Sequence, residues 1–127
     1  MERKETGHLG ENIAVEFLKK RGYQVLDRNY SVAFSGLDKG EIDIVAAKNG
    51  IISFVEVKTG EKDNQTFSPE EKVDFRKQKK LIKLGQSWLI GKKIPLDAPW
   101  QIDVVGIRLN LATRKARIYF FTNICSA

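Results

Sequence analysis

Residues 40–59 read GEIDIVAAKNGIISFVEVKT, and this stretch carries the strongest structural signal in the chain. An Asn-Gly pair between two apolar runs is the strongest short-range sign of a β-hairpin with a two-residue turn. Both runs are rich in Ile and Val, which favour strands. The stretch therefore predicts two antiparallel strands joined at Asn49 and Gly50, with Lys48 opposite Ile51.

This register places charged side chains opposite one another. Asp43 faces Glu56 across the predicted hairpin. One step further along, Glu41 faces Lys58. Because side chains alternate along a strand, these four residues share one face. The other face is predicted to be apolar and carries Ile42, Ile44, Ala46, Val55 and Val57.

The facing carboxylates predict a bound cation between the two strands. Like charges directly opposite each other destabilise a sheet, so the pair of Asp43 and Glu56 calls for compensation. Mg²⁺ prefers oxygen ligands and is usually bound through one or two carboxylates. A lysine such as Lys58 beside that site can orient a water or stabilise developing charge. The alternative is a solvated polar face with a Glu41–Lys58 ion pair of little energetic value.

Length and composition set the broad class. A chain of 127 residues with 42% hydrophobic and 30% charged residues suits a single globular domain, here residues 1–127. No apolar run is long enough to span a membrane, and the N-terminus lacks an apolar signal region, so we expect a cytoplasmic protein without a membrane partner. One Cys and one His argue against a disulfide or a zinc site. A net charge of +6 permits a polyanionic partner.

Helical periodicity predicts a first helix over about 8–21, ending before Gly22. Its buried stripe comprises Gly10, Ile13, Ala14, Phe17 and Leu18. Glu11 lies at the border of this stripe, where it can lean toward the surface on which the helix packs. The alternative is that Glu11 only complements the helix dipole. A strand is predicted over 23–29, and a mobile loop over 30–39.

Ser68-Pro69-Glu70-Glu71 predicts the start of a second helix that runs to about Ile90 and stops at Gly91. Its apolar arc comprises Val73, Phe75, Leu81, Ile82, Leu84, Trp88 and Leu89. A basic stripe on the opposite side comprises Arg76, Lys79, Lys80 and Lys83. This stripe is either a contact surface for phosphate backbones or a solvated face.

Two polar residues of this helix, Lys77 and Gln78, fall inside the apolar arc. They must either reach its edge or face a polar site beneath the helix, for which the acidic hairpin face is the candidate. Further strands are predicted over 100–109 and 117–122. Positive charge gathers near the turn between them, at Arg108, Arg114, Lys115 and Arg117.

An acidic residue followed by Glu-x-Lys, here Asp43 and then Glu56-Val57-Lys58, resembles the signature of PD-(D/E)xK nucleases. A longer match resembles the YraN-like family, whose members are proposed endonucleases related to Holliday-junction resolvases. The matching segments are Gly7 to Glu11 with Ala14, Gly22-Tyr23, Leu26, Arg28-Asn29, 40–46, 54–59, 77–81 and 103–105.

The resemblance implies an α/β fold with a restriction-endonuclease-like αβββαβ core, in which helices flank a mixed central sheet. It also implies a Mg²⁺- or Mn²⁺-dependent endonuclease that hydrolyses phosphodiester bonds in DNA, selects DNA structure, acts in repair or recombination, and could form a homodimer. The alternative is a catalytically inactive nucleic-acid-binding module of the same fold. A protein-interaction module is a third reading, without positive support in the sequence.

The resemblance also implies roles for individual residues. Asp43 and Glu56 would bind the metal, together with a backbone carbonyl near Val57. Lys58 would be the catalytic lysine, and Glu11 the helix acid that supports the site. Gln78 or Lys77 would be a secondary site residue. The expected nucleic-acid contacts are Arg28, Arg76, Lys77, Lys79, Lys80 and Lys83.

Overall fold

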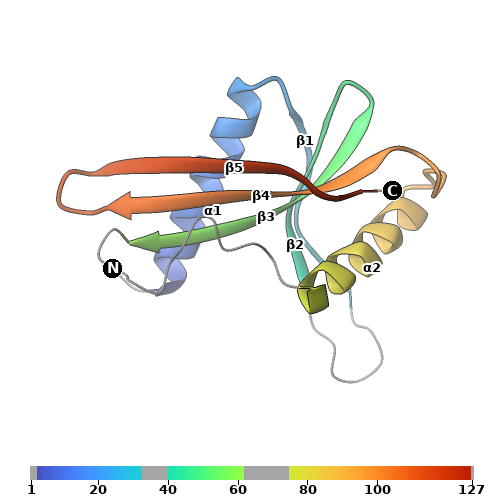
Figure 1. The fold of residues 1–127 in the computed structure, drawn as a ribbon, viewed down its shortest axis with the longest axis horizontal. Helices are drawn as coiled ribbons and strands as arrows, with labels where there is room; N and C mark the ends of the chain where they lie inside the picture. Colours follow the sequence, from blue (N-terminus) through green and yellow to red (C-terminus); the bar gives the residue numbers. More distant parts are fainter. Residues whose placement is uncertain (1–2, 33–39, 62–74, 127) are drawn as a thin grey trace.

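The computed structural model describes residues 3–32, 40–61 and 75–126. Within these residues, two helices and five strands follow one another in the predicted αβββαβ order, with one further strand at the end (Figure 1). They are α1 (Arg3–Lys20), β1 (Gln24–Ser31), β2 (Glu41–Lys48), β3 (Ile51–Glu61), α2 (Phe75–Gly91), β4 (Trp100–Asn110) and β5 (Lys115–Ser126).

The strands form one mixed sheet in the order β1-β2-β3-β4-β5. Only β3 and β4 are parallel, and the other neighbours are antiparallel. Parallel neighbours need a long crossover connection, and the connection between β3 and β4 contains α2. The fold class is therefore the predicted mixed α/β sheet flanked by helices.

The hairpin of β2 and β3 has the predicted register. Asn49 and Gly50 both have positive φ, at 53° and 78°, as a two-residue type I′ turn requires. Lys48 pairs with Ile51, and the pairing continues to Ile44 opposite Val55. The pairing ends there, one residue short of the predicted pair of Asp43 and Glu56.

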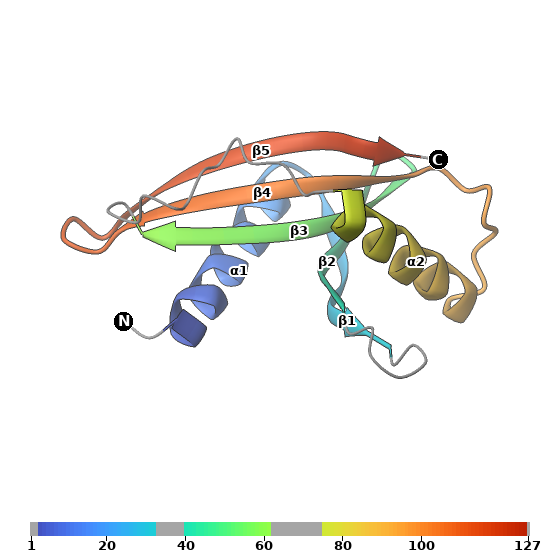
Figure 2. The same cartoon turned by 60° about the horizontal axis from the view of Figure 1, so that its bottom comes forward.

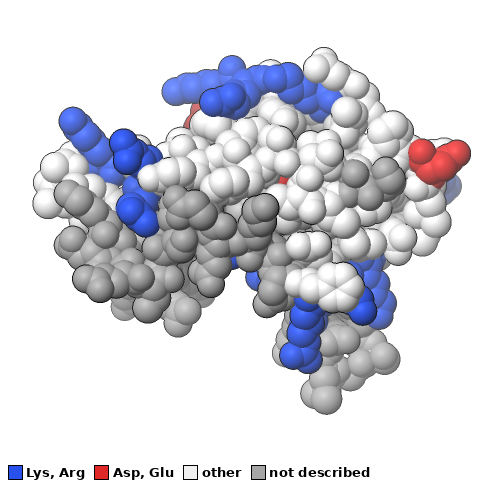
Figure 3. Space-filling model, viewed as in Figure 1, with Lys and Arg blue, Asp and Glu red and all other residues white. Residues whose placement is uncertain are grey.

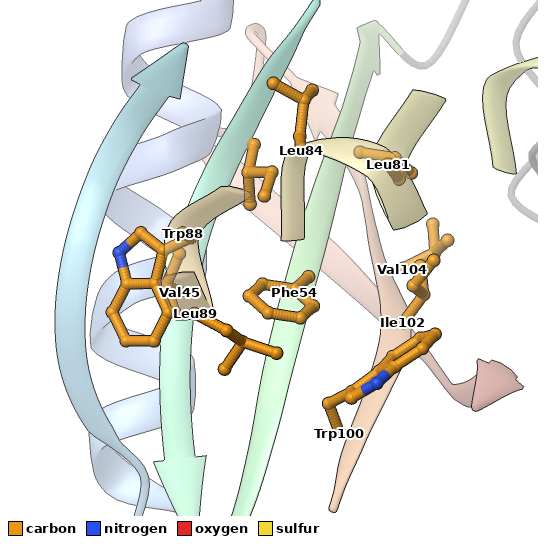
Figure 4. Packing of buried hydrophobic residues seen from close by; sticks show 10 residues of the cluster. Val45, Phe54, Leu81, Leu84, Trp88, Leu89, Trp100, Ile102 and Val104 are labelled. Atoms are coloured by element: carbon orange, nitrogen blue, oxygen red, sulfur yellow. The ribbon is translucent and has the colours of Figure 1, made fainter. Parts of the chain in front are cut away.

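The two helices cover opposite faces of the sheet (Figure 2). Side chains from α1 and the sheet form one core cluster, which comprises Ala14, Val15, Leu18, Ile44, Ala46, Val55, Val105, Ile107 and Leu109. Side chains from α2 and the other face form a second cluster (Figure 4), which comprises Ile42, Val45, Phe54, Leu81, Leu84, Trp88, Leu89, Trp100, Ile102 and Val104. Phe54 and Val55 are neighbours in β3 but belong to different clusters, so the centre of the sheet is buried on both sides.

Two predictions about the hairpin faces were wrong. Ile42 packs in the α2 cluster rather than with Ile44, because the regular alternation breaks where β2 leaves its pairing with β3. The face predicted to be polar also carries Val45 and Phe54, both buried, because α2 covers it.

Glycines let both helices approach β3 closely. A Cβ atom at Gly10 of α1 would lie 1.8 Å from Oγ1 of Thr59. A Cβ atom at Gly85 of α2 would lie 2.6 Å from the ring of Phe54. Neither position accepts a larger side chain without displacing the helix, so these glycines fix how far α1 and α2 stand from the sheet.

The element bounds differ from prediction at several ends. The first helix begins at Arg3 rather than near residue 8, and its added turn buries Thr6. The last strand runs over Lys115–Ser126 because its pairing with β4 continues past 117–122 at both ends. Phe75, predicted in the apolar arc, is 71% exposed, since it lies at the start of α2, away from the packed residues.

Other predicted features lie outside the described residues. These are the helix start at 68–71, Val73 of the predicted apolar arc, and most of the loop at 30–39. Among the described helices, neither has a stretch apolar and long enough to cross a membrane.

Candidate functional site

The predicted acidic residues lie where β2 and β3 separate. Beyond Ile44 and Val55 the two strands are no longer paired. The side chain of Asp43 occupies this fork, where its Oδ2 accepts a hydrogen bond of 2.7 Å from the backbone N–H of Val57. This bond replaces a strand-to-strand bond and fixes one oxygen of Asp43 against β3.

Three carboxylates meet on the α1 side of the fork. Glu11 of α1, Glu41 and Asp43 each offer an oxygen atom, and these atoms lie within 4.8 Å of one another. Glu11 and Asp43 were both predicted site residues. Glu11 of α1 lies close to Asp43 of the hairpin, as expected. Glu41 was expected to face Lys58 and instead lies in this acidic cluster.

Asn29 links the cluster together. Its amide Nδ2 donates hydrogen bonds to Glu11 Oε1 at 2.8 Å and to Glu41 Oε1 at 2.9 Å. The backbone of Asn29 has a φ of 52°, in the left-handed region that Asn adopts more readily than most residues. One amide group therefore offsets part of the repulsion between two carboxylates from different elements.

Arg28 also belongs to this side of the site. It donates a hydrogen bond of 2.9 Å to Asn12 Oδ1, and its Nη2 lies 3.8 Å from Glu11 Oε1. Its side chain is 39% exposed, so this ion pair is screened by solvent. Arg28 was expected to contact nucleic acid, and its guanidinium stands directly beside the acidic cluster.

Glu56 lies on the α2 side of the fork. It is 93% buried, since its relative exposure is 7%. Lys77 of α2 reaches its Oε1 at 2.9 Å. Within the described part of the chain, the buried Oε2 of Glu56 accepts no hydrogen bond. Lys77 therefore faces a polar site under the helix, which was one of its two predicted outcomes.

Burial and the repulsion between neighbouring carboxylates raise the pKa values of Asp43 and Glu56. Burial, followed by the neighbouring charge of Glu56, raises the pKa of Asp43 from 3.8 to about 8, and the Val57 N–H opposes this rise. The carboxylates of Glu11 and Glu41 add smaller contributions in the same direction. Burial also raises the pKa of Glu56, although Lys77 and Lys58 oppose it.

The other predicted residues surround this centre. Lys58 is half-buried on β3, two residues beyond Glu56, and acts on its pKa. Gln78 is half-buried on α2, next to Lys77. Val57 contributes its N–H to Asp43, whereas a role for its carbonyl remains a prediction. Besides Lys77, the basic residues near the start of the described helix are Arg76, Lys79, Lys80 and Lys83; Lys80 is half-buried and the other three are exposed.

Two members of the site were not assigned from the sequence. Asn29 could have been noticed in the sequence, because Asn is disfavoured inside a strand and its presence there indicates a specific role. Glu41 carried a misleading signal, because ideal alternation opposes it to Lys58. The break in alternation beside Asp43 could not be read from residue types.

The donors of the site suit a hard divalent cation. The carboxylate oxygens of Glu11, Glu41 and Asp43 lie within 4.8 Å of one another, and Glu56 is a charged neighbour of Asp43. Carboxylate oxygens are the ligand type that Mg²⁺ and Mn²⁺ prefer. The raised pKa of Asp43 and the buried Oε2 of Glu56 are both features that a nearby cation would relieve. The residues present thus fit such an ion.

Fold and side chains together define a mixed α/β protein with a cluster of carboxylates where two central strands separate. The chain belongs to the uncharacterised protein family UPF0102, whose model matches residues 10–107. This membership confirms the YraN-like family indicated by the sequence motifs.

Individual relatives extend the match over nearly the whole chain. A UPF0102 protein of Alkaliphilus oremlandii is 36% identical over 121 residues, which cover 94% of this chain and 97% of the relative. A UPF0102 protein of Dictyoglomus turgidum is 46% identical over 95 residues, covering 74% of this chain and 75% of the relative. A UPF0102 protein of Clostridium botulinum is 39% identical over 108 residues, covering 84% and 82%.

Proposed function

We propose that this protein is a metal-dependent nuclease of the PD-(D/E)xK type that hydrolyses phosphodiester bonds in DNA. One observation carries the proposal: Asp43 is partly buried at the fork among other carboxylates, with its pKa raised to about 8. A protein gains no stability from crowding carboxylates in this way. Such an arrangement is suited to binding a divalent cation, which would favour the ionised form of each ligand.

Asp43, Glu56 and Glu11 would hold the ion, which would be Mg²⁺ or Mn²⁺. When bound, such an ion lowers the pKa of a water and offsets negative charge on a phosphate. The hydrogen bond from Val57 to Asp43 holds one oxygen in place and leaves the other oxygen available. Asn29 holds Glu11 and Glu41 at a fixed separation before any ligand arrives.

The lysines would act on the substrate side. Lys58 lies on the same strand as Glu56 and two residues away, so both side chains point to the same face. Its ammonium group can donate hydrogen bonds to a phosphate oxygen or to the attacking water. Lys77 pairs with Glu56 from an exposed position on α2, so it can move to a phosphate when a cation takes over that carboxylate.

The test is a cleavage assay with branched, double-stranded and single-stranded DNA in the presence of Mg²⁺ or Mn²⁺. The wild-type protein should cleave at least one of these substrates, and EDTA should stop the reaction. Asp43→Asn and Lys58→Ala should each remove activity while leaving the thermal unfolding cooperative. Full metal-dependent cleavage by either variant would contradict these roles. DNA binding without cleavage of any substrate would favour an inactive binding module.

A further inference from the structure

The hairpin of β4 and β5 carries a basic surface separate from the carboxylate site. Its residues 108–117 read RLNLATRKAR, with four basic residues and no acidic one. Arg108 lies opposite Arg117, and Asn110 lies opposite Lys115. A cross-strand pair of like charges adds nothing to hairpin stability. The sequence of this hairpin therefore concentrates positive charge at one end of the sheet.

These basic residues share a sheet face with Glu56. In β4, Ile102 and Val104 pack toward α2, so alternation puts Arg108 and Asn110 on that same face. Their β5 partners, Arg117 and Lys115, lie on it as well. Glu56 reaches Lys77 of α2, which places its side chain on this face too.

The surface is hollowed. A cavity of about 470 Å³ is lined by Arg108, Asn110, Thr113, Lys115, Ala116 and Arg117. Figure 1 shows the hairpin extending away from α2 toward the left of the view. Figure 3, in the same view, shows Lys and Arg atoms gathered at that end of the molecule. This surface, consisting of Arg108, Arg114, Lys115 and Arg117, is called the hairpin patch below.

Register gives the distance from the hairpin patch to the carboxylates. Glu56 lies beside Val104, and Lys115 lies beside Asn110, six residues further along β4. At about 3.3 Å per residue this is about 20 Å. A nucleic-acid duplex rises about 3.4 Å per base pair, so about six base pairs span this distance.

We infer that the hairpin patch binds the phosphate backbone of a duplex about six base pairs away from the carboxylate site. A duplex is stiff over this length, so one that reaches both places would run between them without bending. Proteins that hold single strands use aromatic side chains to stack bases, and residues 108–117 contain none. The inference takes from the proposed function only the choice of nucleic acid as the polyanion.

The test measures binding without catalysis. A labelled duplex of about 20 base pairs is titrated in EDTA at salt concentrations between about 50 and 200 mM. The variant Lys115→Ala/Arg117→Ala is compared with Lys19→Ala/Lys20→Ala, which removes the same charge from exposed positions on α1. A third variant, Lys115→Arg/Arg117→Lys, keeps the charge of the hairpin patch.

Log affinity falls as log salt concentration rises, and in the hairpin variant the magnitude of this slope should be smaller by about 2. Wild-type affinity should therefore fall about tenfold more than the variant's across that salt range. The α1 variant and the charge-conserving variant should behave as wild type, and a single strand of the same length should be less affected by the hairpin variant.

Three results would overturn the inference: an unchanged slope in the hairpin variant, an equal change in the α1 variant, or displacement of the duplex by polyglutamate at matched charge. Because cleavage is not measured, failure of the nuclease proposal would leave this result intact. An active nuclease whose hairpin variant binds as wild type would refute the hairpin patch alone.

Discussion

Replacing Asp43 by Asn should stabilise the metal-free protein at neutral and alkaline pH. The pKa of Asp43 is raised to about 8 in the fold, against an ordinary value of 3.8. A carboxyl whose pKa is raised by folding contributes stability below its ordinary pKa and loses that contribution as the pH rises through the folded value. Asp43 therefore costs the wild-type protein stability progressively between about pH 4 and pH 8.

The size of the effect follows from the same values. Each pH unit between 3.8 and about 8 corresponds to about 1.4 kcal/mol. Solvent reaches the partly exposed side chain and reduces this cost, so we expect about 2 to 3 kcal/mol at pH 8. For a chain of this size that is a rise in melting temperature of about 10 °C. Asn can still accept the hydrogen bond from Val57, so the fork itself is preserved.

Thermal unfolding in EDTA from pH 4 to pH 9 measures the effect. The two proteins should have equal stability near pH 4 and diverge as the pH rises, with Asp43→Asn the more stable. Adding Mn²⁺ should raise the melting temperature of the wild type and leave that of the variant unchanged. Parallel pH profiles for the two proteins would refute the reasoning, because they would mean that Asp43 ionises in the fold as it does in water.

Substitutions at three further positions test separate parts of the account. Lys77→Met removes the cation beside buried Glu56, so stability should fall by about 1 to 2 kcal/mol at neutral pH. Burial raises the pKa of Glu56, so this loss should shrink as the pH falls and the carboxylate takes up a proton; a loss in chemical denaturation that does not change with pH would contradict this. Asn29→Gly keeps the left-handed backbone but removes the amide that holds Glu11 and Glu41, so Mn²⁺ affinity should fall about tenfold or more with little loss of stability. Asn29→Ala should lose about 1 kcal/mol in addition, because its φ of 52° is strained for Ala, and equal stability of the two variants would argue against that strain. Gly85→Ala places a Cβ atom 2.6 Å from the Phe54 ring and should cost about 1 to 3 kcal/mol in urea unfolding, whereas a change within error would mean that α2 shifts freely.

The main architecture could be predicted because its signals are local. The Asn49-Gly50 turn sets the hairpin register, and that register is confirmed from Lys48 opposite Ile51 to Ile44 opposite Val55. The pairing of β2 with β3 ends at Ile44, and the regular alternation of side chains along β2 fails between Ile44 and Ile42. This failure depends on how α1 and α2 pack from the two sides, which no local pattern records. The face assigned to Ile42 was wrong for the same reason.

The site was predictable in its members more than in its arrangement. Glu11 lies beside Asp43 as its position at the border of the helical stripe suggested. Lys77 meets Glu56, which was one of the two outcomes predicted for a polar residue within the apolar arc of the helix. Glu41 could not be placed by an ideal hairpin, since its position depends on Asn29, whose left-handed backbone lies in another strand.

Calorimetric titration of Mn²⁺ into the wild-type protein and into Asp43→Asn tests the central claim most directly. The account predicts that the wild type binds Mn²⁺ with release of protons below pH 8, because the ion favours the ionised carboxylates. Asp43→Asn, although more stable, should show little or no binding. Equal Mn²⁺ binding by the two proteins, or none by the wild type, would contradict the claim that these carboxylates form a metal site.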